Sequence, residues 1–442
     1  MRIPFPTSDG SRSSVVRAIT MPISLAISLL TAHLMIDELG SETFAAVMVV
    51  TTLSQLLPFT DFGVGASVLN ATADEKASAE ERILVLVAAQ RVLLISGGTV
   101  VALAGAISAF DFWGPLLGDG VGALRAPGVT AFAYFVLFAL WINMQLGNRV
   151  LTGSQRNYLV IAIGSSAGLI NIILVAVATR FDLEPDFYCL ASMVGLVLTS
   201  QLVCSLAAKS LGVTIATVLY RAAFTRQSPS SRIHRTALPM LVIMIAVPAT
   251  LHTDRLLLSH LGSAIDLARY SVAFQIYLPL WTAASSVLIV LWPAFNRLRS
   301  VSGTRASFLE LKRQSVRLLL AGILAAAGLW ILQPLVTAWL SQSEATAPQT
   351  LAASFALLLL AQIVQFPIGM YLTNERGLRF QAICVTGMLV VSVPVSALSI
   401  QLLGPAGPIL TSAICVTVFQ TIPGWVFARR DSHASQKLEI SV

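Results

Sequence analysis

Charged residues are scarce in this chain: Asp, Glu, Lys and Arg make up only 11% of its 442 residues, whereas 56% are hydrophobic. A soluble domain has about 25% charged and 45–50% apolar residues, so this chain has too few charges to cover a water-facing surface. Apolar runs of about 20 residues, the length that a helix needs to cross the hydrocarbon core, recur from end to end. The composition therefore excludes a soluble globular protein and predicts a polytopic membrane protein.

The four cysteines all lie inside apolar runs, and none shows C-x-x-C spacing. This pattern indicates packed thiols rather than disulfides or a metal site. Carboxylate pairs and metal-ligand spacings are also missing, and the longest predicted outer loop covers only 111–127. An integral-membrane glycosyltransferase or polymerase would need such groups, so we expect no enzyme, no catalytic residues, no metal and no cofactor.

The net charge of +7 does not indicate a nucleic-acid partner, because the basic residues are scattered between apolar spans. Arg2, Arg12 and Arg17 precede the first apolar run, which is too long for a signal peptide and lacks a small-residue cleavage site. We expect this run to remain as the first span.

The apolar runs predict twelve membrane-spanning helices and no strands. The predicted spans are 15–36, 43–69, 90–110, 128–147, 158–179, 188–208, 237–258, 267–292, 315–333, 350–371, 380–402 and 407–428. With both termini in the cytoplasm, 24 of the 28 Lys and Arg residues fall in cytoplasmic segments. This asymmetry satisfies the positive-inside rule and predicts a multi-pass membrane protein with cytoplasmic termini.

A repeat divides the chain into halves. Leu39-Gly40-Ser41 aligns with the triplet that begins at Leu261, and Pro58 aligns with Pro279, at an offset of about 221 residues. Six spans per half predict two lobes related by a pseudo-two-fold axis along the membrane normal, with a substrate site between them. The predicted parts are an N-terminal lobe (1–210), a basic linker (211–235), a C-terminal lobe (236–428) and a cytoplasmic tail (429–442).

The first span has one narrow polar face. With 100° per residue, Arg17, Thr20, Ser28 and Thr31 fall within about 40° of Ser24. This stripe favours the wall of a water-filled cavity, although small polar residues also form hydrogen bonds between packed helices.

Polar positions recur in two other spans. In the eighth span, Ser271, Thr282 and Ser286 lie within roughly 40° of Gln275. The second span carries a looser set over about 120°: Thr51, Ser54, Gln55 and Asp61. We expect these spans to line a pathway.

Ionisable residues inside apolar spans are the sharper candidates, because a charge at the bilayer centre costs about 2.5–3.5 kcal/mol on insertion scales. The set comprises Arg17, Asp61, Arg91, Arg149, Asp254, Arg255 and Arg269. Arg91 and Arg149 fit snorkelling to the interface, and Asp254 with Arg255 fits a mutually compensating pair. Arginine binds phosphate bidentately, so a cationic cavity suits an anionic headgroup. The two carboxylates, Asp61 and Asp254, are candidates for coupling to H⁺ or Na⁺.

Several short motifs of this chain resemble those of polysaccharide flippases. In chain order they are LGSETF, DFGVGASVLN, TDRLLLSHLGS, ARYSVAF and PAFNRL. Polysaccharide flippases belong to the multidrug/oligosaccharidyl-lipid/polysaccharide exporter (MOP) superfamily, which includes the MATE transporters. The resemblance implies an alternating-access transporter that flips polyprenyl-diphosphate-linked oligosaccharides across the bacterial inner membrane for polysaccharide biosynthesis. It also implies a basic cavity, to which Arg17 is the best-matched contributor.

The predicted substrate-binding residues are Arg17, Ser24, Ser28, Thr31, Gln55, Arg255, Arg269 and Gln275. Expected partners are the anionic lipid-linked glycan, membrane lipids and, through the pathway that the resemblance implies, a polysaccharide polymerase or glycosyltransferases. A drug or cation antiporter of the same superfamily and a lipid II flippase remain alternatives. A major-facilitator transporter is disfavoured, because the loop after the second span reads NATADEKASAEER and lacks that family's motif.

Overall fold

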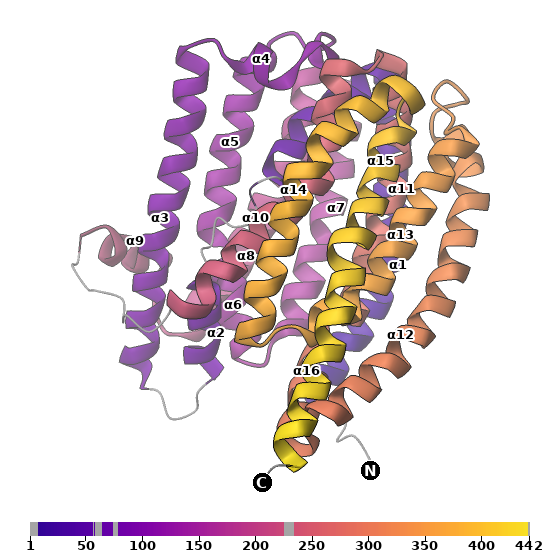
Figure 1. Cartoon of the computed structure of the whole chain (residues 1–442). Helices are drawn as coiled ribbons and strands as arrows, with labels where there is room; N and C mark the ends of the chain where they lie inside the picture. The colour runs from indigo at the N-terminus through magenta and orange to yellow at the C-terminus, as the bar shows by residue number, and fades with distance from the viewer. Residues whose placement is uncertain (1–7, 56, 58–63, 74–77, 225–233, 441–442) are drawn as a thin grey trace. The chain divides into compact units, whose positions relative to one another are not determined.

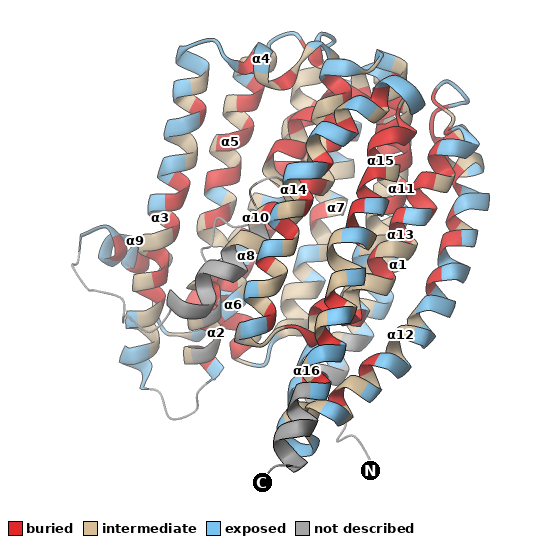
Figure 2. Cartoon of the chain, in the orientation of Figure 1, coloured by how far each residue is buried: buried red, intermediate tan, exposed pale blue. Residues whose placement is uncertain are grey.

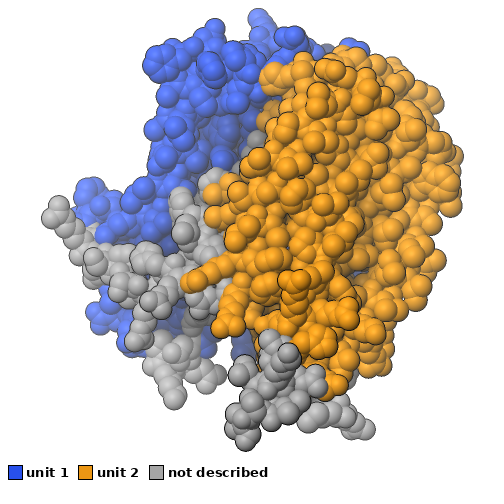
Figure 3. Space-filling view, in the orientation of Figure 1, with its two compact units in different colours: residues 1–232 blue, residues 233–442 orange. Residues whose placement is uncertain are grey.

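The structure is a computed structural model that describes residues 8–55, 57, 64–73, 78–224 and 234–440. Every regular element in these ranges is helical, so the predicted all-α class is confirmed. Two compact units divide the chain, Met1–Arg232 and Ile233–Val442, shown in different colours in Figure 3. We refer to them as unit 1 and unit 2.

The described part of unit 1 contains ten helices, and Figure 1 labels nine of them, α1 to α9. They are α1 (Ser8–Gln55), α2 (Val64–Ala73), α3 (Ala79–Ala109), α4 (Trp113–Leu117), the 3₁₀ helix η1 (Asp119–Val121), α5 (Pro127–Met144), α6 (Leu146–Gly153), α7 (Asn157–Arg180), α8 (Pro185–Ser210) and α9 (Ile215–Phe224). The last of these, α9, lies within the segment that the sequence marks as a linker.

Unit 2 follows with a second set of helices. They are α10 (His234–Leu261), α11 (Ala264–Leu288), α12 (Leu291–Leu340), α13 (Gln349–Tyr371), α14 (Glu375–Leu403), α15 (Ala406–Cys415), the π-helix η3 (Val416–Thr421) and α16 (Ile422–Ile440). In Figure 2, α13 is mostly coloured as buried, and 61% of the residues in its most apolar stretch are buried. This helix is therefore the core of unit 2.

Ten helices in the described part of the chain are long and apolar enough to cross a membrane. This is the pattern of a multi-pass membrane protein, whereas the number twelve stays a prediction. Four predicted spans are not single helices. The span 43–69 is shared between α1 and α2, 128–147 between α5 and α6, 267–292 between α11 and the start of α12, and 407–428 between α15, η3 and α16.

The turn between the first two predicted spans lies inside α1. Gly40 adopts φ 77° and ψ 162°, a backbone conformation that is essentially restricted to glycine, so the helix breaks there and resumes at once. The aligned triplet in unit 2 also separates two helices, since α10 ends at Leu261 and Ser263 is the N-cap of α11. The Ser263 hydroxyl accepts a hydrogen bond from the Asp266 N–H. Both copies of the repeat therefore mark a helix-to-helix turn.

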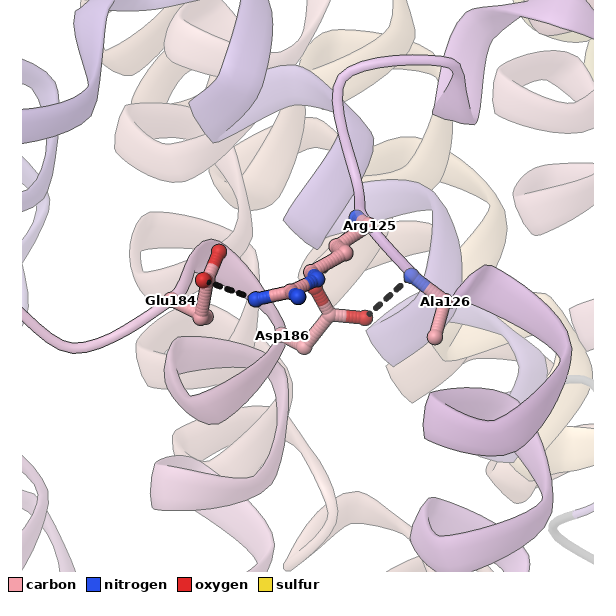
Figure 4. Close-up of polar contacts among 4 residues, drawn as sticks. All are labelled: Arg125, Ala126, Glu184 and Asp186. Carbon is pink, nitrogen blue, oxygen red and sulfur yellow. Dashed lines mark hydrogen bonds and ion pairs between the residues drawn. The ribbon is translucent and has the colours of Figure 1, made fainter.

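The loop before α5 and the loop between α7 and α8 are fastened to each other (Figure 4). The Asp186 carboxylate accepts hydrogen bonds from the N–H groups of Arg125 and Ala126, at 3.0 and 3.1 Å, and from the Thr130 hydroxyl. Arg125 also forms an exposed ion pair with Glu184. Asp186 thus joins the N-terminal end of α5 to the start of α8 and places its negative charge at the positive end of the α5 dipole.

Candidate functional site

Two adjacent ionisable residues of α10 lie in the interior of unit 2. Asp254 is 2% exposed and Arg255 is 3% exposed. Charged groups almost never reach this degree of burial unless other groups satisfy them, and inside a membrane span they usually mark a functional site. The surroundings of these two side chains therefore define the candidate site.

Asp254 joins three helices of unit 2. Ser396 of α14 donates a hydrogen bond to one carboxylate oxygen at 3.2 Å, and Ser412 of α15 donates to the other at 3.1 Å. Both serines are buried, with 1% and 0% of their surface exposed. The result is a compact group of carboxylate and hydroxyl oxygens, the ligand type that hard cations prefer. We call it the Asp254 cluster.

Arg255 faces a different helix, because consecutive residues of an α-helix point about 100° apart. Its guanidinium carbon lies 4.8 Å from the ring centroid of Phe274 and 5.7 Å from that of Tyr270, both on α11. The ring of His252, one turn earlier on α10, meets Phe274 edge-on with centroids 6.0 Å apart. Cation–π contact of this kind stabilises a desolvated guanidinium by about 2 kcal/mol or more.

The aromatic wall behind Arg255 continues into α13. Tyr270, Phe274 and Tyr277 each contact the ring of Phe355, with centroids 5.2–6.3 Å apart. The Tyr277 hydroxyl donates a hydrogen bond to the side-chain oxygen of Gln362. These contacts fix the α11 face against which the arginine packs.

The structure changes the interpretation of Asp254 and Arg255. The sequence allowed them to form a mutually compensating pair, whereas the described hydrogen bonds to the Asp254 carboxylate come from two serines on other helices. Sequence reasoning missed Ser396 and Ser412. One signal was available: Ser392, Ser396 and Ser399 recur at helical spacing and form a polar stripe on α14.

The predicted substrate-binding residues of unit 1 all lie on α1. Arg17, Ser24 and Ser28 are partly buried, and Thr31 is buried with its hydroxyl donating to the Ile27 carbonyl at 2.7 Å. For Thr31, bonding within its own helix supplies the partner that a buried hydroxyl needs.

Farther along α1, the polar residues of the second predicted span contact α5. The hydroxyls of Ser54 and Tyr134 lie 2.9 Å apart, and the Tyr134 hydroxyl also donates to the Thr51 carbonyl at 3.2 Å. Gln55 is partly buried at the last residue of α1, and Asp61 lies outside the described residues.

The other predicted residues of unit 2 lie on α11. Arg269 is in the second turn, with its guanidinium nitrogen 3.9 Å from a carboxylate oxygen of Asp266. Gln275 is partly buried and directly follows Phe274, whereas Arg269 directly precedes Tyr270, so each is one residue away from the aromatic wall. Within unit 2, the structure thus places Arg255 against the α11 face formed by Tyr270 and Phe274.

The arrangement of helices matches solved transporters over nearly the whole chain. An inward-facing multidrug resistance MATE family transporter of the MOP superfamily superposes with a TM-score of 0.62 at 17% identity, covering 96% of this chain and 99% of that one. The lipid II flippase MurJ, in an inward closed conformation, gives a TM-score of 0.64 at 14% identity and covers 94% and 87%. The Vibrio cholerae MATE transporter VcmN in its bent form gives 0.57 at 15%, covering 98% and 99%.

A scan against protein-family models and a search of curated sequences found no match. The structural matches define the class of fold: this chain has a MATE-like transporter fold. The fold that the sequence resemblance implied is thereby confirmed. At these identities the matches concern the fold alone.

Proposed function

We propose that this protein is a membrane transporter that flips an anionic, polyprenyl-diphosphate-linked oligosaccharide across the bacterial inner membrane by alternating access, driven by a cation that binds at the Asp254 cluster. The observation that carries the proposal is the buried Asp254 carboxylate between Ser396 and Ser412, inside a unit with the MOP fold. A buried carboxylate that is bound by hydroxyls from two other helices changes its interactions when a cation enters. It can therefore couple cation binding to helix packing.

The anionic substrate is supported by the distribution of charge. The first span carries Arg17 on its polar stripe and no acidic residue before Asp37. Guanidinium groups bind phosphate oxygens through paired, charge-assisted hydrogen bonds. Arg255, by contrast, contacts phosphate only in a conformation that exposes it, because here it lies against Phe274 and Tyr270.

Flipping is measured in proteoliposomes that hold the lipid-linked oligosaccharide in one leaflet, by the fraction that becomes accessible to a membrane-impermeant glycosidase. We expect Arg17→Ala to slow flipping about tenfold or more, the loss typical of one charge-assisted hydrogen bond. Arg17→Lys should restore part of the rate, and Arg12→Ala, an exposed arginine on the same helix, should leave it unchanged. Equal rates for the wild type and Arg17→Ala would refute the role of Arg17.

Coupling is tested by imposing a Na⁺ or a pH gradient on the same vesicles. Asp254→Asn keeps the size of the side chain and removes the charge, so gradient-driven flipping should be lost. The control is Asp266→Asn, which alters a helix-capping carboxylate at the start of α11 in the same unit. Gradient-driven flipping that survives in Asp254→Asn would place the coupling site elsewhere.

The structural neighbours suggest two alternative functions, and each has its own measurable outcome. One neighbour is a multidrug resistance transporter and another is a lipid II flippase. Efflux of a cationic dye without flipping would favour the antiporter, and preference for lipid II over other polyprenyl diphosphates would favour the peptidoglycan precursor.

A further inference from the structure

A cavity of about 320 Å³ lies within unit 1, bounded by α3, α5, α6, α8 and α9. Its lining includes Leu94, Leu140, Met144, Val218 and Leu219, and no residue of α1 contributes to it. The cavity is therefore separate from the helix that carries the predicted substrate residues. The proposed transport function makes no use of it.

The chemistry of the lining favours hydrocarbon. Three amide side chains, Gln90, Asn143 and Gln201, are the polar members of an otherwise apolar wall that also includes Cys204. Gln90 donates a hydrogen bond to Asn143 at 3.1 Å, and Asn143 donates to the Ala139 carbonyl at 2.8 Å. Two of the three amides, Gln90 and Asn143, are therefore hydrogen-bonded within the protein. Water requires several polar partners, and apolar cavities of this kind hold apolar guests instead.

The helix α9 forms one wall and has the character of an interfacial helix. Val218 and Ala222 are buried, whereas Tyr220 and Phe224 are 66% and 74% exposed with their rings 5.1 Å apart. The Arg91 side chain on α3 donates to the Ala222 carbonyl at 2.8 Å and so fastens α9 to its neighbour, beside which it lies in Figure 1. Amphipathic helices with exposed aromatic residues lie at the level of the lipid headgroups.

The cavity reaches the surface of unit 1, because two of its lining residues remain exposed: Leu140 of α5 at 46% and Leu219 of α9 at 36%. Exposed basic residues stand next to the lining in sequence, namely Arg149, Lys209 and Arg221. On the helices that supply the walls, acidic residues occur only in the first turns of α3 (Glu80 and Glu81) and α8 (Asp186). The charge around the cavity is therefore complementary to an anionic headgroup.

We infer that this cavity binds one acyl chain of an anionic phospholipid, whose headgroup is held by the basic residues beside α9. The volume equals that of about ten water molecules at about 30 Å³ each, and a methylene group is of similar size. The cavity thus accommodates a large part of one linear chain. The inference does not depend on the proposed transport function.

The test uses the full-length protein purified in detergent and incubated with phosphatidylglycerol or phosphatidylcholine, with retained lipid counted by native mass spectrometry. We expect selective retention of phosphatidylglycerol. Ala208→Phe places a ring in the cavity and should reduce retention about tenfold, the effect of about two methylene groups losing their burial. Ala176→Phe, the same change at an exposed position of α7, should retain lipid as the wild type does.

A second measurement does not depend on how well the cavity-filling variant folds. Wild-type protein is irradiated with phosphatidylglycerol carrying a diazirine on its acyl chain, and the crosslinked peptides should come from α3, α5, α6, α8 and α9. The triple variant Arg149→Gln, Lys209→Gln, Arg221→Gln should lose the preference for phosphatidylglycerol over phosphatidylcholine.

Three outcomes would overturn the inference. The first is equal retention of lipid in Ala208→Phe and the control Ala176→Phe. The second is a set of crosslinks confined to other helices. The third is preferential retention of an added polyprenyl phosphate, which would assign the cavity to an isoprenoid chain.

Discussion

Gly40 provides a direct test of how the turn inside α1 is built. Its φ of 77° and ψ of 162° lie in a region that residues with a Cβ avoid, and an added Cβ would meet no atom within 4 Å. The cost of Gly40→Ala is therefore purely conformational, about 1–3 kcal/mol. Asn tolerates left-handed helical backbone angles but not the φ and ψ of Gly40. Gly40→Asn should therefore destabilise the protein as much as Gly40→Ala does.

The assay is thermal unfolding of the purified protein in detergent. For a unit of about 200 residues, 1 kcal/mol shifts Tm by about 2–4 °C, so Gly40→Ala should lower Tm by roughly 2–12 °C. Gly98→Ala is the matched control, because Gly98 also has open space around its Cβ position but lies within the helix α3. That substitution should stabilise by about 0.5–1 kcal/mol.

Gly262, the aligned glycine of unit 2, is constrained by the space around it. A Cβ at Gly262 would lie 2.9 Å from the Leu258 carbonyl oxygen, so Gly262→Ala is costly through crowding rather than through φ. An unchanged Tm in Gly40→Ala, or a loss in Gly98→Ala as large as in Gly40→Ala, would refute the reasoning about the turn.

Two further predictions concern stability. Asp186→Ala should cost about 1–2 kcal/mol by removing the hydrogen bonds to the Arg125 and Ala126 N–H groups before α5. Glu184→Gln should change Tm little, since exposed ion pairs contribute about 0–1 kcal/mol, and equal shifts would contradict the role of Asp186. Arg299 donates to the Tyr371 carbonyl at 3.1 Å and lies 4.4 Å from its ring centroid. Arg299→Lys keeps the charge but loses the planar stacking, so Tm should fall by an amount equivalent to about 1 kcal/mol, and an unchanged Tm would show that charge alone suffices.

Much of the fold was accessible from local pattern. Hydropathy runs predicted the membrane helices, because a chain in lipid must satisfy its backbone within each segment. The repeated Leu-Gly-Ser triplet predicted equivalent turns, and both copies do separate helices. The breaks inside four predicted spans were not visible, since an apolar run has the same hydropathy whether its helix is continuous or interrupted.

The candidate site was accessible only in part. Burial cost alone identified Asp254 and Arg255 as residues that require an explanation. Their partners could not be found this way, because Ser396 and Ser412 lie 142 and 158 residues from Asp254. A serine within an apolar helix gives the same signal whether it packs against a neighbour or binds a carboxylate.

The amino-acid sequence by itself determined that this chain is an all-helical membrane protein with an internal repeat, because composition and periodicity act residue by residue along the chain. Only the tertiary structure decided that Asp254 is held by serines from α14 and α15 while Arg255 packs on the rings of α11. Hydrogen bonds and ring contacts between distant segments depend on helix rotation and on packing in three dimensions. Neither is encoded in any local stretch of residues.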